Sequence, residues 1–354
     1  MVAAQQADRP KHRFVISPDE PLYRNAIARE LYFWSHKRVM TDKERVSYPA
    51  LHPLVVAYLN TLFSGSPDCD WLDLVIAKFH PNGRAASLGS GIGFYERRLL
   101  AECDIKEIDL FELCPANLDR ARSRLEIPGR RVGYYDVDLN FAELPPKTYD
   151  LIISRFFLHH IVNLEHLLYQ VSQALTDEGV FVLFDYVGDS RYRWSEAKKK
   201  FINGLLEELK PLGVVGLPLG THPGDDLIAP DDPAHFQTLI TNSPFETIRS
   251  GEIVSVLEKQ FATARLTEVK YGAVLHAAFR TLDYSDWNHP GLCQALKTFI
   301  ELDQVATAND LFKPCGLFGI YGKGLDQPPD SLPWSKEKIQ AELFCNENHA
   351  PCGT

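Results

Sequence analysis

A glycine-rich turn in the first third of the chain could bind a ligand. Residues 85–93 read Ala-Ala-Ser-Leu-Gly-Ser-Gly-Ile-Gly, and residues 94–102 have the composition of a helix. Because glycine lacks a Cβ, the turn can be tight and its backbone can approach a ligand closely. Free amides at the start of the following helix favour polar or anionic groups. A dinucleotide fingerprint counted from Gly89 would need glycine at position 94, which is Phe94. The turn is therefore compatible with a ligand site or with an ordinary strand-to-helix turn, and it argues against a nicotinamide-dependent reductase.

Two carboxylates follow the turn at positions where a nucleotide would need them. Glu112 ends a predicted strand over 107–112, and Asp138 lies near the end of a predicted third strand over 133–140. A carboxylate at the tip of the second strand, about 20 residues after the glycine turn, is where ribose hydroxyls sit in a doubly wound sheet. The second carboxylate can accept a hydrogen bond from an adenine amine.

Polar side chains also end the next two predicted strands. A fourth strand over 149–161 carries His159 and His160 at its end, and a fifth strand over 179–186 ends in Asp185-Tyr186. A histidine at such a place could act as a general base, because its pKa lies near neutral pH. The alternative is that each ring orders the end of the strand through a hydrogen bond to the backbone. Both interpretations stay open at this point.

Strands and helices alternate from residue 85 to residue 186. The stretch 163–176 carries its apolar residues on one face, as does a helix that packs on a sheet. This order predicts an α/β fold with a Rossmann-like, doubly wound parallel sheet and right-handed crossovers. After residue 186 the alternation breaks, and 214–244 is rich in glycine and proline.

Residues 84–186 resemble the core of the class I S-adenosylmethionine-dependent methyltransferases, in their small-molecule branch. The resemblance rests on the glycine turn, on Glu112 followed by Leu-Cys-Pro, on Asp138-Leu139-Asn140 and on Leu158-His159-His160-Ile161. It implies S-adenosyl-L-methionine as the cofactor. The cofactor-binding residues that it implies are Gly89, Ser90, Gly91, Gly93, Glu112, Leu113, Asp138, Leu139, Ser154 and Arg155.

The sequence departs from this family at one position of the glycine turn. Ser87 stands two residues before the first glycine, where the family often has Asp or Glu. The resemblance therefore implies the turn itself, but no carboxylate at this position for the methionine amine.

The flanking segments predict a three-part organisation. A methyltransferase domain spans 81–325, with an N-terminal arm and helical cap over 1–80 and a C-terminal extension over 326–354. The resemblance implies a seven-stranded, mostly parallel sheet whose last two strands pair antiparallel at the edge. Residues 185–244 form an insertion on the substrate side, in which 220–232 is either a lid or a surface loop without ligand contact. The substrate-binding residues that we expect are Tyr48, His52, Tyr186, His222 and His276.

The composition restricts the partners. A formal net charge of −10 argues against non-specific binding of nucleic acid, which needs a basic surface. The seven cysteines form no C-x-x-C pair, which is typical of reduced thiols in a cytoplasmic protein and not of a disulfide framework or a zinc finger. No apolar run reaches the roughly 20 residues that cross a bilayer, so we expect no membrane partner. The oligomeric state is open, and a homodimer is compatible with the sequence.

The strand ends also bear on metal chemistry. A metal-dependent O-methyltransferase needs oxygen ligands from Asp and Asn at the ends of the fourth and fifth strands. These ends offer Ser154, Arg155 and Asp185, and an arginine would repel a cation. We therefore predict a metal-independent methyltransferase that acts on an oxygen of a small molecule. N-methylation, C-methylation and a catalytically inert, cofactor-binding regulatory protein are alternatives that the sequence leaves open.

Overall fold

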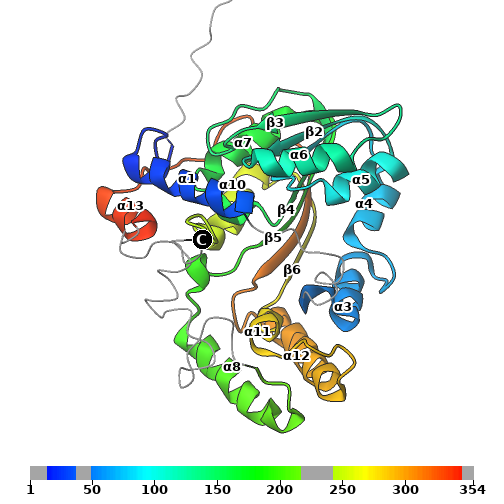
Figure 1. Ribbon diagram of the computed structural model, residues 1–354, viewed down its shortest axis with the longest axis vertical. Coiled ribbons are helices and arrows are strands. Elements are labelled where there is room, and N and C mark those ends of the chain that lie inside the picture. Colours follow the sequence, from blue (N-terminus) through cyan, green and yellow to red (C-terminus); the bar gives the residue numbers. More distant parts are fainter. Residues whose placement is uncertain (1–13, 37–48, 217–241, 345–354) are drawn as a thin grey trace, which may run out of the picture.

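Seven strands form one mixed sheet in the computed structural model, which describes residues 14–36, 49–216 and 242–344 (Figure 1). The strand order is β3-β2-β1-β4-β5-β7-β6. Strands β1 to β5 run parallel, and β7 runs antiparallel to both β5 and β6. This topology confirms the predicted seven-stranded, mostly parallel Rossmann-like sheet. The strands are β1 (Asn82–Leu88), β2 (Asp104–Glu112), β3 (Arg131–Asp136), β4 (Tyr149–Arg155), β5 (Leu175–Tyr186), β6 (Arg265–Tyr271) and β7 (Gly316–Tyr321).

Two strands, β3 and β4, end earlier than the sequence predicts. The sequence predicts a third strand to residue 140, whereas β3 ends at Asp136, because the carbonyl of Asp138 accepts the amides of residues 141 and 142 in a turn. It predicts a fourth strand to residue 161, whereas β4 ends at Arg155. Phe156 then has a φ of +50°, and residues 158–160 form a 3-10 turn. The polar groups beyond these strands therefore lie in turns.

Helices cover both faces of the sheet. Leu151 and Ile153 of β4 belong to one hydrophobic core, and Ile152 belongs to another, because successive side chains of a strand point to opposite faces. The core around Ile152 is closed by α7 (Leu164–Ala174) and α10 (Ile253–Phe261). The other core is closed by α3 (Pro53–Ser64), α4 (Trp71–Phe79), α5 (Phe94–Glu102), α6 (Pro115–Arg124), α8 (Glu196–Leu209), α11 (Leu275–Thr281) and α12 (Pro290–Ala308).

A third, smaller core joins distant parts of the sequence. Helices α1 (Pro21–His36) and α13 (Lys336–Leu343) pack there with Phe245 and Ile248, and the two helices lie side by side in Figure 1. Val162, just beyond the turn that follows β4, belongs to the same core. Helix α1 therefore lies against the edge of the sheet where the sequence places the ligand-binding residues. The predicted boundaries at residues 80 and 325 stay a prediction.

Among the described residues, no helix has the length and apolar character needed to span a membrane.

The longest described helix, α12, begins at Pro290, where the Nδ1 atom of His289 accepts the Gly291 amide. Residues 282–289 therefore separate α12 from α11.

A buried carboxylate on α12 fixes the helices around the edge strand β6. Asp303 is fully buried and accepts a hydrogen bond from the Tyr58 hydroxyl of α3 at 3.0 Å. It also accepts the amides of Gly272, Val274 and Leu275 at 3.0, 2.7 and 3.0 Å. A buried charge is stable only where partners satisfy it, and these donors do so. Asp303 thereby holds α3 and the start of α11 in one arrangement.

We predict that Asp303→Ala lowers the free energy of unfolding by about 3 kcal/mol or more. Three amides and one hydroxyl would lose their acceptor inside the protein, and each unsatisfied group costs about 1–3 kcal/mol. Urea denaturation followed by circular dichroism measures the change. Asp303→Asn keeps one oxygen acceptor and should be less destabilising. An alanine variant as stable as the wild type would contradict this role.

Candidate active site

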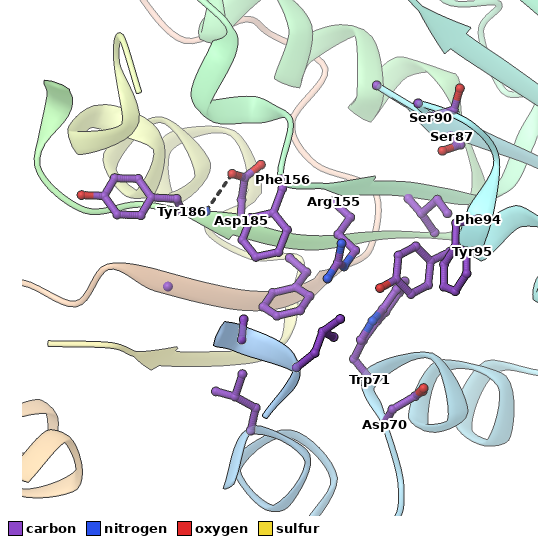
Figure 2. Close-up of a pocket in the computed structure, with 18 of the residues that line it drawn as sticks. Asp70, Trp71, Ser87, Ser90, Phe94, Tyr95, Arg155, Phe156, Asp185 and Tyr186 are labelled. Atoms are coloured by element: carbon purple, nitrogen blue, oxygen red, sulfur yellow. Dashed lines mark hydrogen bonds between the residues drawn. The ribbon is translucent and has the colours of Figure 1, made fainter. Parts of the chain in front are cut away.

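A cavity of about 590 Å³ opens at the carboxyl ends of β1, β4 and β5 (Figure 2). Its volume lies within the range of about 300–1,000 Å³ that is typical of ligand sites. Ser90, between Gly89 and Gly91, lines one end, and Tyr186 lines the other together with His276, whose ring packs against it. Open α/β sheets bind their ligands at this edge. We therefore take the cavity as the candidate active site.

The glycines of the turn serve different purposes. Gly89, Gly91 and Gly93 have φ values of +63°, +55° and +71°, a backbone region that glycine adopts without strain. A Cβ on Gly89 would lie 2.2 Å from the Phe157 ring, and one on Gly93 would lie 2.8 Å from Leu125. A Cβ on Gly91 would meet no atom within 4 Å. Packing therefore requires glycine at two positions, whereas the space beside Gly91 is left for a ligand.

Glu112, at the end of β2, supports the glycine turn. Its Oε2 atom accepts the Gly91 amide at 2.8 Å, and its Oε1 atom accepts the Cys114 amide at 3.0 Å. Burial raises the pKa of the Glu112 carboxyl, and these hydrogen bonds offset part of that effect. Glu112 thus orients a backbone amide that belongs to the cavity wall.

A carboxylate that the sequence analysis did not identify lies beside Ser87. The Ser87 hydroxyl donates to Glu96 Oε1 at 2.5 Å, and both residues line the cavity. Glu96 stands in the first turn of α5, so the helix supplies the carboxylate that the family often has at position 87. Its Oε2 atom is buried and has no hydrogen-bond partner among the described residues. Burial also raises the pKa of this carboxyl. The signal in the sequence was an acidic residue in the helix turn directly after the glycines.

Arg155, the last residue of β4, is held by aromatic rings (Figure 2). Its guanidinium carbon lies 4.5 Å, 4.7 Å and 5.3 Å from the ring centres of Tyr95, Phe156 and Phe184, within the range of cation–π attraction. Its Nε atom is buried and makes no hydrogen bond within the described part of the chain. The N–H groups of Arg155 therefore remain available to an anionic group of a ligand.

The middle of the cavity is apolar. Side chains from α3 and α11 close it opposite the strands, and such a chamber excludes water and binds the apolar body of a ligand. The apolar and aromatic side chains of this chamber are Leu51, Val56, Leu59, Phe63, Phe184, Tyr271, Leu275 and Phe279.

His276 of α11 stands at the far end of this chamber. Its ring packs against Tyr186, with centres 5.1 Å apart, and lies nearly parallel to Tyr192, at 6.2 Å and 14°. Burial, together with the charges of Arg280 and Lys198, lowers the pKa of His276 to about 3. The imidazole is therefore neutral near pH 7 and can accept a hydrogen bond from a ligand.

Several of the predicted cofactor residues do not reach this cavity. Asp138 accepts the Tyr23 hydroxyl of α1 at 2.7 Å and the Asn140 amide at 3.0 Å, so it ties the turn after β3 to α1. Gly89, Ser90, Gly91 and Arg155 line the cavity, whereas the roles of the other predicted residues stay predictions. The predicted cofactor residues outside its wall are Gly93, Glu112, Leu113, Asp138, Leu139 and Ser154.

The two histidines predicted as catalytic lie behind the cavity wall. His159 is 6% exposed, and its Nδ1 atom lies 2.5 Å from Oδ1 of Asp185, which does line the cavity. The Nδ1 atom of His160 lies 3.1 Å from Glu30 Oε1. Neither ring is among the described residues that form the wall. This placement favours the interpretation that the rings order the turn after β4, through carboxylates and not through the backbone.

The predicted substrate residues are distributed unevenly. Tyr186 and His276 line the cavity. His52 is 2% exposed and caps α3: its Nδ1 atom accepts the Leu54 amide at 3.3 Å, and its Nε2 atom lies 3.1 Å from the Trp287 carbonyl. The structure thus gives His52 a structural place away from the wall. Tyr48, His222 and the predicted lid over 220–232 lie outside the described residues.

Comparisons with known proteins agree with this architecture. Residues 86–181 match the family model described as "Methyltransferase domain", a stretch that contains the glycine turn and strands β2 to β4. No curated protein is significantly similar to the chain in sequence. Together with the strand order, the family match confirms the predicted resemblance, and with it S-adenosylmethionine as the cofactor.

Solved structures similar to this one include three methyltransferases. An S-adenosylmethionine-dependent methyltransferase from Leishmania major is 21% identical over 50% of this chain and 66% of that chain, with a TM-score of 0.36. Phosphoethanolamine N-methyltransferase 2 from Haemonchus contortus is 14% identical over 82% and 61%, with a TM-score of 0.41. Geranyl diphosphate C-methyltransferase from Streptomyces coelicolor A3(2) is 13% identical over 87% and 100%, with a TM-score of 0.44. The chain spans less than two thirds of the length of the first two proteins.

We predict that Gly91→Ala weakens binding of S-adenosylmethionine by about tenfold or more, a loss of about 1.4 kcal/mol. The added methyl group would occupy space that the ligand needs beside the backbone. Gly65→Ala is the matched control, because Gly65 also has a positive φ and open space around it but does not line the cavity. Isothermal titration calorimetry on both folded variants measures the affinities. Equal affinities for the two variants would contradict the assignment.

Proposed function

We propose that this chain, whose residues 86–181 form a class I S-adenosylmethionine-dependent methyltransferase domain, methylates an oxygen of a small and largely apolar acceptor. One observation carries the proposal: a single cavity joins the glycine turn to an apolar chamber that ends at Tyr186 and His276. The turn end suits the cofactor, and the apolar end suits the acceptor. Methyl transfer needs both molecules in one enclosed space.

The charged groups near the turn fit the amino acid part of the cofactor. Methionine carries an ammonium and a carboxylate on the same carbon. Glu96 Oε2 and Arg155 Nε are both buried and lack hydrogen-bond partners among the described residues, and both side chains line the cavity. A buried polar atom without a partner is costly, so a ligand that satisfies both atoms gains binding energy. We assign Glu96 to the ammonium and Arg155 to the carboxylate.

The main task of the protein in the transfer is to align the acceptor oxygen, the methyl carbon and the sulfur. S-adenosylmethionine supplies a methyl carbon that is already activated by its sulfonium. The sulfur–methyl bond breaks, the sulfur keeps the electron pair, and an oxygen–methyl bond forms. Walls that hold the acceptor in line can remove about 7–11 kcal/mol of the barrier. No step in the cavity uses a metal ion.

His276 is suited to receive the proton that the acceptor oxygen releases. A neutral hydroxyl that gains a methyl group becomes a protonated ether, which is a strong acid. A base with a pKa of about 3, such as His276, is therefore strong enough to take the proton at this stage. Before the transfer, the same ring nitrogen accepts a hydrogen bond from the hydroxyl and orients it.

The polar groups of the far end favour a hydroxyl over an amine. A protonated amine would need a carboxylate partner, whereas Tyr186, His276 and Cys315 are the polar groups at this end of the described wall. Asp185 also lines the cavity, but its two oxygens already accept three backbone amides. An amine would therefore lack a counter-charge in this part of the cavity.

We predict that Glu96→Gln raises the Kd for S-adenosylmethionine by about 10- to 100-fold. A hydrogen bond between charged groups contributes roughly 1.5–3 kcal/mol, and the amide removes the negative charge. Glu102→Gln, on the same helix but bonded to Arg98 and away from the cavity wall, is the control. An unchanged Kd in the Glu96 variant would show that the ammonium binds elsewhere.

We predict that apolar acceptors with one hydroxyl give O-methyl products. A panel of matched alcohols, phenols and amines, analysed by mass spectrometry and NMR, identifies the methylated atom. His276→Gln should lower kcat by about tenfold, less than the 100-fold or more of a base that removes the proton in the transition state, with little change in the Kd for the cofactor. Methylation at nitrogen or carbon would overturn the choice of oxygen. Tight cofactor binding without turnover on any acceptor would support the inert alternative.

A further inference from the structure

A cluster of imidazoles and carboxylates lies behind the cavity wall, at the turn that follows β4. One ring nitrogen each of His159 and His160 and one carboxylate oxygen of Glu246 lie within 4.8 Å of one another. His159 and Glu246 stand almost 90 positions apart in the sequence, so only the fold brings them together. The proposed methyl transfer uses none of the three side chains.

Two distances between ring nitrogens and carboxylate oxygens of the cluster are close to the separation of two ligand atoms on one metal ion. The Nε2 atom of His159 lies 3.7 Å from Glu246 Oε1, and the Nε2 atom of His160 lies 3.6 Å from Glu246 Oε2. Both distances are too long for hydrogen bonds. Ligand atoms at about 2.0–2.2 Å from a tetrahedral metal ion are about 3.3–3.5 Å apart. The two distances reach different oxygens of Glu246, and the three ligand atoms lie within 4.8 Å of one another, so rotations of the side chains would bring them around one ion.

The other nitrogen of each imidazole faces a buried carboxylate: Nδ1 of His159 makes a hydrogen bond, whereas the buried Nδ1 of His160 makes none within the described part of the chain. The Nδ1 atom of His159 lies 2.5 Å from Asp185 Oδ1, and Nδ1 of His160 lies 3.1 Å from Glu30 Oε1. Glu30 is itself fixed, because it accepts the Ser243 hydroxyl and the Phe245 amide. Metal-binding histidines almost always show this pattern, with a carboxylate or carbonyl on the nitrogen that does not bind the ion.

The charge of the cluster also calls for a cation. Three carboxylates, from Glu30, Asp185 and Glu246, surround two imidazoles in a largely buried place. With neutral rings these five side chains carry a charge of −3, and the buried guanidinium of Arg191, which donates to the Glu246 carbonyl, offsets this charge in part. The hydroxyl of Tyr192 donates to Glu246 Oε1 at 2.7 Å, which satisfies one oxygen but adds no charge. A dication would reduce the charge of these five side chains to −1.

We propose that His159, His160 and Glu246 bind a divalent transition-metal ion of the zinc type, with Asp185 and Glu30 as the groups that orient the two rings. Two imidazole nitrogens and one carboxylate suit zinc, iron or nickel, whereas magnesium and calcium prefer oxygen ligands. The ion would join the turn after β4 to the segment around Glu246. It lies outside the cavity wall, so its role is to hold that turn and not to take part in methyl transfer.

The same cluster could be neutralised by protons instead of a metal ion. Burial lowers the pKa of His160, but the charges of Glu246 and Glu30 outweigh this effect and hold it above its usual value. A doubly protonated pair would satisfy the carboxylates without any ion. The two explanations differ in one measurable quantity, which is the binding of metal near neutral pH.

The first experiment titrates the chelator-treated wild-type protein with Zn²⁺, and separately with Co²⁺ and Mg²⁺. We expect one tightly bound Zn²⁺ or Co²⁺ per chain and at least 100-fold weaker binding of Mg²⁺. Bound Co²⁺ should show visible d–d bands without thiolate charge-transfer bands, because none of the proposed ligands is a cysteine. The Tm should rise with Zn²⁺ concentration, since an ion that binds only the folded state stabilises it. A wild-type protein that binds neither Zn²⁺ nor Co²⁺ would overturn the proposal in favour of the protonated pair.

The second experiment removes the ligands one at a time. His160→Gln and Glu246→Gln should each weaken Zn²⁺ binding by 100-fold or more, and Glu30→Gln should weaken it by about 10- to 100-fold, as for other groups that orient a metal-bound histidine. His289→Asn is the matched control, because it removes a histidine that caps α12 and keeps a capping side chain. Binding that survives in His160→Gln and Glu246→Gln, or a thiolate spectrum with Co²⁺, would place the ion elsewhere and contradict the assignment. The Glu246 variant tests the site even if the His160 variant fails to fold.

Discussion

The carboxylate of Asp185 sets the geometry of the catalytic edge. Asp185 is fully buried near the end of β5, and its Oδ2 atom accepts the amides of Phe157 and Leu158 at 2.9 Å and 2.6 Å. Its Oδ1 atom accepts the Tyr186 amide at 2.7 Å and faces His159. Because β5 is the neighbour of β4 in the sheet, one strand end determines how the chain turns after the other.

The position of the turn after β4 determines the shape of the cavity beside the glycine turn. The amide of Phe157 is held by Asp185, and its ring fills the space where a Cβ of residue 89 would lie. The Phe157 ring thus packs against Gly89 of the glycine turn, and the Glu112 carboxylate accepts the Gly91 amide. Asp185, Phe157 and Glu112 together give the turn one conformation before any ligand binds. A preformed site of this kind loses less entropy when it binds its ligand.

The sequence predicts the fold well because the fold depends on local patterns. Alternating apolar strands and amphipathic helices predict the parallel part of the sheet, whereas the antiparallel last pair follows from the family resemblance; the glycine turn and Glu112 follow from their distance along the chain. The residues that the sequence did not identify depend on contacts between elements, although the position of Glu96 just after the glycines was a signal for one of them. Glu96 reaches Ser87 from a helix, and Glu246 reaches the histidines from a segment beyond the insertion. His52 illustrates the converse, because a histidine before Pro53 is equally compatible with a ligand site and with the helix cap that the structure shows.

The packing of α13 against α1 has a consequence for the order in which the chain acquires its structure. The buried side chain of Arg191 donates to the carbonyls of Pro244 and Glu246 and to the Glu342 carbonyl of α13. All seven strands have been synthesised once Tyr321 leaves the ribosome. Helix α1, in contrast, is made early and packs in a core that includes Ile339 and Leu343 of α13. A nascent chain can therefore form its sheet and cavity walls before α13 is available to complete this smaller core.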